Sequence, residues 1–215
     1  PVFGTPAAIN AFALGAQLTN PRAQIELKWS CMPGNPTQEF IRDGIRVISN
    51  RDTPAEDKLH TEYGTYYIDG SGEFIPLGSP CWIWGKFYEN VIRAILSGTW
   101  DDIHGQAVND WWGMSSGAEE IDYSKDLPAG TLQLLDLMEK MLSENNLRIF
   151  PEDLYAQGHV LHSPEAVVYS PKELMEMDWL DECVEGALPH YDELDVKTHV
   201  LMAINGLNTL KGFVK

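Results

Sequence analysis

Three short apolar runs, each of strand-like length, constrain the fold of this chain more than any other feature. They are Gln24–Ser30, Ile45–Asn50 and Thr65–Asp69, and a segment of helical character separates each run from the next. Because parallel neighbouring strands need a long crossover, usually a helix, this order is typical of parallel βαβ units. The sequence therefore predicts an α/β fold with a Rossmann-like parallel sheet flanked by helices.

Ligands of such sheets bind at the carboxyl ends of the strands, so the residues that follow each run are the candidates for a binding site. A Trp farther along could stack on a flat ligand. The candidate ligand-binding residues are Trp29, Ser30, Asn50, Asp52, Asp69 and Trp82. Each has a structural alternative: Asp69 can begin a turn before Gly70, and Asn50 or Asp52 can cap the helix that follows.

Charge and composition exclude several classes of function. The formal net charge of −17 argues against binding to nucleic acid or to anionic lipid, because both need basic residues. Cys31, Cys81 and Cys183 lie far apart without a CxxC pair, so they predict neither a disulfide framework nor a zinc site, and we expect them to be buried. His159 and His162 fall on opposite faces of a predicted strand, which argues against a shared metal. We expect no cofactor.

Apolar periodicity predicts further helices, and two capping boxes, at Thr53 and Ser170, mark helix starts. The predicted helices are Thr5–Asn20, Thr37–Arg42, a helix from Pro80 to Gly98, Pro128–Leu142, a helix from Ser170 towards Gly186, and Tyr191–Leu210. Gly70–Gly78 is rich in turn residues, and two more strands are predicted at Leu147–Phe150 and Gly158–His162. A change of composition at 99–126 predicts a ligand-binding lobe at 1–125 and a C-terminal part at 126–215.

Several segments, in this order and spacing, resemble the second half of a basic-membrane-protein (BMP) family lipoprotein. The segments are Pro1–Ala16, Asn20-Pro21, Trp29-Ser30, Ile68-Asp69, Gly98-Thr99-Trp100 and Leu174–Leu180. These PnrA-like proteins are substrate-binding components of ABC transporters. The resemblance implies the type I periplasmic-binding fold, here with its first lobe largely missing. Only the first Asp of the family's Gly-x-Asp-x-Asp run is kept, as Asp69.

The resemblance also implies a function: capture of a nucleoside-like molecule between lobes, without chemistry and without a cofactor. The partners it implies are an ABC permease and the missing N-terminal lobe, or a second chain, against the helix of Trp84. The full-length protein would be extracytoplasmic and lipid-anchored, with the anchor outside this chain. The alternatives are a cytoplasmic ligand sensor of the same fold and a hydrolase that uses the acidic residues Asp101, Asp102, Glu119 and Asp122.

Overall fold

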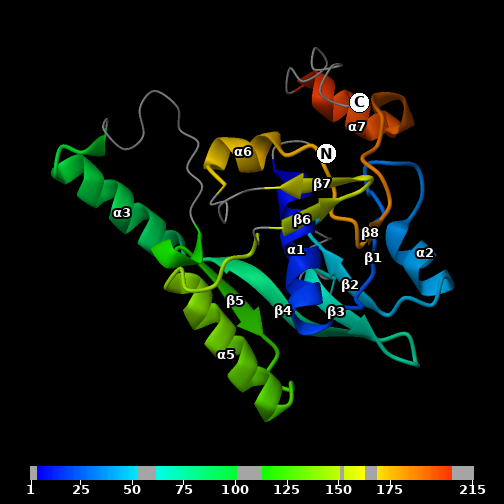
Figure 1. Ribbon diagram of the computed structural model, residues 1–215, viewed down its shortest axis with the longest axis horizontal. Helices are drawn as coiled ribbons and strands as arrows, with labels where there is room; N and C mark the ends of the chain where they lie inside the picture. The colour runs from blue at the N-terminus through cyan, green and yellow to red at the C-terminus, as the bar shows by residue number, and fades with distance from the viewer. Residues whose placement is uncertain (1–3, 53–61, 101–112, 151–152, 163–168, 205–215) are drawn as a thin grey trace. The chain divides into compact units, whose positions relative to one another are not determined.

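The computed structural model describes residues 4–52, 62–100, 113–150, 153–162 and 169–204 (Figure 1). Its contacts divide the chain into two compact units, which are described separately below. The first unit combines residues 1–39 with 148–215, and the second unit is 40–147. The division predicted from sequence after residue 125 stays a prediction, and the contacts group the chain in a different way. The capping box predicted at Thr53 lies outside the described residues.

The first unit contains a pair of parallel strands, although the partner of the first apolar run is a short strand that the sequence did not predict. Strand β1 (Ile25–Glu26) pairs in parallel with β8 (Val184–Glu185), in the register Ile25 to Val184. Helix α1 (Thr5–Thr19) packs on this pair, and the buried core joins Ala13 to Leu180, Cys183 and Val184. The predicted α/β class, with parallel strands and flanking helices, is thus confirmed.

The other elements of the first unit follow the prediction with shifted bounds. They are α2 (Pro36–Arg42, which ends in the second unit), β6 (Asp153–Ala156), β7 (His159–His162), α6 (Pro171–Glu176), a 3-10 turn at Tyr191–Glu193 and α7 (Val196–Ile204). Ser170 opens α6 with the predicted capping box. The strand predicted at Leu147–Phe150 is wrong. The partner of β7 in the hairpin is β6, and a turn that contains Gly158 joins the two strands.

A buried asparagine joins the start of the chain to its last quarter. Asn10, fully buried on α1, accepts a bond from the backbone N–H of Asp181 at 2.9 Å. Its Nδ2 donates to the carbonyl of Trp179 at 2.9 Å and lies 3.2 Å from the sulfur of Met177. Because a buried amide is costly unless its donors and acceptor are all used, this side chain fixes the position of residues 177–181 against α1.

The second unit corrects the predicted pairing of the other two apolar runs. Strands β2 (Val47–Asn50), β3 (Gly64–Ile68), β4 (Phe74–Trp82) and β5 (Glu119–Tyr123) form one sheet in chain order, and every pair is antiparallel. Asn50, the last residue of β2, lies opposite Gly64, the first residue of β3. Apolar runs of this length look alike in both pairings, which is why the sequence alone did not separate them.

Strand β4 is an element of this unit that the sequence did not predict. Residues 70–78 read as turns because of their glycines and prolines, but the turn ends at Glu73, and Pro76 and Pro80 lie within the strand. Helix α3 (Trp84–Leu96) follows, and after a 3-10 turn (Met114–Ser116) and β5 comes α5 (Ala129–Ser143). The core of this unit is Ile48, Tyr66 and Ile68, with Phe74 and residues near Phe40 packed around it.

The three cysteines do not all meet the expectation of burial. Cys183 lies in the core of the first unit, whereas Cys31 and Cys81 are half-buried. Cys31 lies in the loop after β1, and Cys81 lies near the end of β4, where one side of the strand stays accessible. The expectation is therefore right for Cys183 and wrong for the other two.

Candidate functional site

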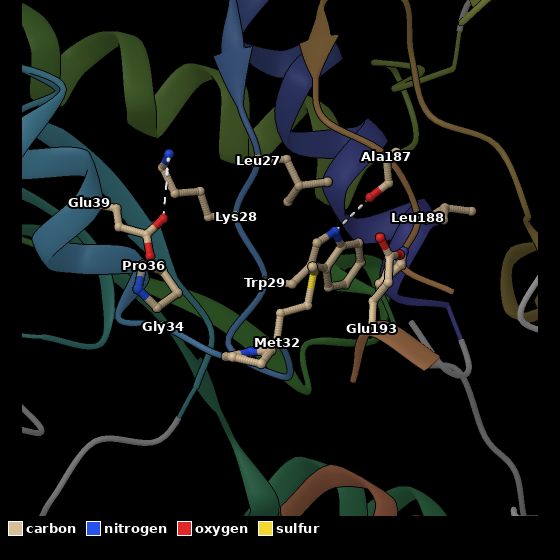
Figure 2. Close-up of a pocket in the computed structure, with 12 residues that line it drawn as sticks. Leu27, Lys28, Trp29, Met32, Gly34, Pro36, Glu39, Ala187, Leu188 and Glu193 are labelled. Carbon is tan, nitrogen blue, oxygen red and sulfur yellow. Dashed lines mark hydrogen bonds and ion pairs between the residues drawn. The ribbon is translucent and has the colours of Figure 1, made fainter. Parts of the chain in front are cut away.

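The first unit has a cavity of about 280 Å³ at the carboxyl ends of its two parallel strands (Figure 2). One wall follows β1, a second follows β8, and the remainder comes from the loop before α2, the start of that helix and the Tyr191 turn. The lining residues are Leu27, Lys28, Trp29, Met32, Pro33, Gly34, Pro36, Glu39, Ala187, Leu188, Pro189 and Glu193. This is the edge at which parallel α/β sheets bind their ligands, as the sequence predicted for Trp29.

The two strand ends approach each other closely because of a glycine. The backbone N–H of Leu27 donates to the carbonyl of Glu185 at 2.8 Å, which continues the pairing one residue beyond β1. Gly186 has φ +144°, and a Cβ there would lie 3.0 Å from Cβ of Leu27 and 3.1 Å from its carbonyl oxygen. The Gln157 side chain donates to the carbonyls of Val184 and Gly186, at 2.6 and 2.8 Å, and so holds β8 from its other side.

The indole of Trp29 is fixed against the opposite wall. Its Nε1 donates to the carbonyl of Ala187 at 2.8 Å, a contact between residues 158 positions apart in the chain (Figure 2). A Trp whose polar edge is bonded to backbone keeps its ring in one orientation, so its faces serve as an apolar surface for a flat solute. Ser30, the neighbouring candidate, is exposed and is not among the residues that line the cavity.

Charged side chains complete the wall of the cavity. The Nζ of Lys28 lies 2.6 Å from Oε1 of Glu26 and 3.8 Å from Oε2 of Glu39. Glu193 accepts a bond from the backbone N–H of His190 at 2.7 Å, which closes the 3-10 turn. The cavity thus presents an aromatic ring, aliphatic side chains and carboxylates, a combination that can hold a flat solute bearing hydroxyl or amino groups.

The candidates after β2 and β3 make contacts within their own turns in the second unit. Oδ1 of Asp69 accepts bonds from the backbone N–H groups of Ser71 and Glu73 and from the Ser71 hydroxyl, at 2.7 to 2.9 Å. The Ser71 hydroxyl bond, the strongest influence, holds the pKa of this carboxyl below its ordinary range. Asn50 donates to the carbonyl of Glu62 at 2.8 Å and accepts from the N–H of Asp52 at 3.0 Å. A ligand role for these three residues stays a prediction.

Trp82, the last candidate, begins a row of aromatic and aliphatic side chains on α3. Its ring centroid is 6.1 Å from that of Trp84, which in turn is 6.3 Å from Tyr88. Trp82, Trp84 and Tyr88 are exposed, as are Ile92, Ile95 and Leu96 farther along. The exposure of this helix is the state that the resemblance implied for a chain without the first lobe.

Only two of the four acidic residues of the hydrolase alternative, Glu119 and Asp122, lie among the described residues. Asp101 and Asp102 lie outside the described residues. Glu119 and Asp122 pair with different positions of β4, Trp82 and Ser79, and a separation of three places them on opposite faces of β5. Burial raises the pKa of the Glu119 carboxyl. Within the described part of the chain, no group of three or more His, Cys, Asp or Glu side chains could hold a metal ion.

Sequence reasoning found Trp29 and missed most of its neighbours. Lys28, Glu39 and Glu193 join the cavity through the loops after β1 and β8, and no short motif links them. The strand at Val184–Glu185 is only two residues long, so a run of apolar residues could not reveal it. Gly186 and Pro189 follow this strand, but the sequence analysis interpreted Gly186 as the end of a helix.

Comparison with known proteins places these observations in context. The chain is 24% identical over 155 residues to a purine-binding protein of Brucella abortus (strain 2308), covering 66% of this chain and 43% of that protein. It is 29% identical over 131 residues to a putative ABC transporter glucose-binding protein of Haloferax volcanii, covering 54% of this chain and 32% of that protein. No family model matches the chain.

The matched region therefore spans less than half of each relative's own length. Among the described helices, none has the length and apolar character needed to cross a membrane. Both relatives carry names of binding proteins, one of them of an ABC transporter, which is the class that the segments quoted above resemble. The sequence relationship thus agrees with the predicted resemblance to substrate-binding proteins: this chain is similar to one purine-binding protein and to one putative glucose-binding protein of an ABC transporter.

Proposed function

We propose that this chain contributes a solute-binding site to an ABC uptake system and captures a nucleoside-like molecule without chemical change. The observation that carries the proposal is the cavity beside Trp29, at the carboxyl ends of β1 and β8. The relationship to a purine-binding protein supports a purine as the flat part of the solute. The proposed partner is an ABC permease, and the proposed location is extracytoplasmic, with a lipid anchor outside this chain.

The chemistry of the cavity suits such a solute. A purine stacks on a fixed indole through dispersion and quadrupole interactions, and ribose hydroxyls donate to carboxylates such as Glu193. The volume of about 280 Å³ lies near the lower limit of small-molecule pockets, so a nucleoside rather than a larger cofactor is the appropriate size class. A ligand role for Asn50, Asp52, Asp69 and Trp82, which lie in the second unit, stays a separate prediction.

The exposed row on α3 supports a further part of the proposal, a covering partner. We infer that other polypeptide, the first lobe or a second chain, covers the apolar face that includes Trp84, Tyr88 and Ile92. Light scattering of the 215-residue chain at increasing concentration tests this inference, since an uncovered face favours self-association. A clean monomer at millimolar concentration contradicts it.

Isothermal titration of the chain with adenosine, inosine, guanosine, uridine, adenine and glucose tests the ligand. We expect a purine nucleoside to bind most tightly. Bound ligand also stabilises the folded state, by about 2.7 kcal/mol at a ligand concentration 100 times the dissociation constant, and so raises the midpoint of thermal unfolding. Mass spectrometry of the recovered solute should show it unchanged, because the proposal assigns the chain no chemistry.

Two substitutions of tryptophan locate the site. Trp29→Leu removes the ring from the cavity and should weaken binding about five- to tenfold, the upper part of the range for aromatic stacking. Trp84→Leu is the matched control, because it removes an exposed indole from α3 in the other unit and should leave affinity unchanged. Equal affinity in wild type and Trp29→Leu places the ligand elsewhere, and tightest binding of glucose replaces the nucleoside with a sugar.

A further inference from the structure

Lys28 is the positively charged side chain among the described residues that line the cavity, and it forms ion pairs with two carboxylates. Its side chain is 19% exposed, with Glu26 at 2.6 Å and Glu39 at 3.8 Å. Glu39 and Glu193 are the acidic side chains of the lining. The lining therefore carries one positive and two negative charges, and Glu26 adds a third negative charge directly behind Lys28.

The position of Glu39 is built into the loop before α2. Its backbone N–H donates to the carbonyl of Asn35 at 3.0 Å, in the first turn of the helix. Gly34, at φ +134°, leaves room for the carboxylate, since a Cβ there would lie 2.6 Å from Oε1 of Glu39. The other oxygen, Oε2, faces Lys28 (Figure 2). Loop and helix together aim this carboxylate at the lysine.

The arrangement has a consequence for solute charge. An ammonium group whose charge is compensated by two carboxylates attracts an incoming phosphate less than an uncompensated one, and movement toward the phosphate would weaken its contacts with Glu26 and Glu39. The remaining charge of the lining is negative and repels anions directly. A neutral solute pays neither of these costs.

We propose that Glu39 is a specificity-determining residue: by holding Lys28 together with Glu26, it excludes anionic solutes and reserves the cavity for neutral or cationic ones. The proposal rests on the assignment of the cavity as the solute site. It goes further in naming the residues that set the charge selectivity, and it predicts that a nucleoside is taken in preference to its phosphorylated form because Lys28 is already engaged.

Substitution of Glu39 by glutamine tests the proposal with little change of shape. Glu39→Gln removes one of the two carboxylates that compensate the charge of Lys28, so it should raise the affinity for adenosine 5′-monophosphate, relative to adenosine, about five- to tenfold. Inorganic phosphate is the second ligand, because its binding beside Lys28 needs no purine contact. Both gains in affinity should shrink as salt is raised from about 0.05 to roughly 0.5 M, because the Debye length shortens and charges are screened more strongly.

Two further variants separate release of Lys28 from a general loss of negative charge. Glu193→Gln removes the same charge from the lining but keeps an acceptor for the His190 N–H and leaves Lys28 held, so we expect at most about a twofold gain for the phosphates. Adding Lys28→Met to Glu39→Gln should return the selectivity to that of the wild type. Far-ultraviolet circular dichroism checks that each variant is folded.

The outcomes distinguish this inference from the proposed function. If no variant binds adenosine but Glu39→Gln alone gains affinity for inorganic phosphate, the nucleoside assignment fails and the charge-selecting role of Glu39 stands. If wild type binds adenosine but Glu39→Gln shows no gain for either phosphate, the inference is overturned while the proposed function stands. An equal gain in Glu193→Gln, or a gain that persists without Lys28, also overturns it.

Discussion

Replacing Asn10 by alanine should destabilise the first unit more than any surface substitution. The change removes the acceptor of the Asp181 N–H and the donor to the Trp179 carbonyl, both at 2.9 Å. The loss leaves one buried backbone N–H and one part-buried carbonyl without their bonds, at about 1–3 kcal/mol for a fully buried group and less for the carbonyl. We therefore expect a loss of about 2–5 kcal/mol, which lowers the unfolding midpoint by about 2–4 °C for each kcal/mol in a chain of this size.

Asn10→Asp is the matched variant, because it keeps the shape and the acceptor and replaces only the donating amide. Its carboxyl would lie buried beside a carbonyl oxygen, so its pKa should rise above the unfolded value of about 3.9. The folded state then binds the proton more tightly than the unfolded state. The stability of Asn10→Asp should consequently be greatest near pH 4 and fall as pH rises through the folded pKa.

Urea denaturation of wild type, Asn10→Ala and Asn10→Asp at pH 4, 6 and 8, followed by circular dichroism, measures these differences. The gap between wild type and Asn10→Asp should widen with pH, while the gap for Asn10→Ala should stay nearly constant. A loss below about 0.5 kcal/mol for Asn10→Ala, the size of an ordinary surface change, would refute the reasoning.

Three more predictions address single contacts. Gly186→Ala should lower the free energy of unfolding by about 2–3 kcal/mol, measured by urea denaturation. Gly158→Ala is the control, with an expected loss of about 1 kcal/mol, because its φ is also positive but its Cβ would meet nothing within 4 Å. Equal losses contradict the close approach of the strand ends. Ser170→Ala should lower the stability by about 1 kcal/mol. The Ser170 hydroxyl lowers the pKa of the Glu173 carboxyl, so the same substitution should raise that pKa, as NMR titration can measure. Burial raises the pKa of the Cys183 thiol to about 12, so iodoacetamide at pH 8 should modify the half-buried Cys31 and Cys81 before Cys183, and the reverse order contradicts this burial.

Local signals in the sequence predicted local structure well. Helix α1 follows from its apolar spacing, and the capping box at Ser170 is present because both of its bonds form between residues three apart. Pairing between strands needs information that apolar runs do not carry, so β2 and β3 were assigned to the wrong kind of sheet. Strand β4 was hidden because Pro76 and Pro80, which disfavour strands, are tolerated in it.

The site was predictable only where a rule about strand ends applied. Trp29 lies three residues after the end of β1, and the rule pointed to it as a candidate. The hydrogen bond of Trp29 to Ala187 and the ion pair of Lys28 with Glu39 depend on which loops lie close together in the folded chain. Sequence patterns do not contain that information. Asp69 differs from Trp29. It follows the end of β3 as predicted, but its Oδ1 accepts backbone hydrogen bonds within its own turn.

The bonds of Asn10 have a consequence for the order in which the chain can fold during synthesis. Its partners lie 167 to 171 residues farther along, and β1 likewise finds its partner only at β8. The second unit pairs strands that follow one another in the chain. On the ribosome, the intervening unit can therefore complete its sheet while the N-terminal helix waits, with its apolar side open to chaperones, until the residues around Val184 emerge.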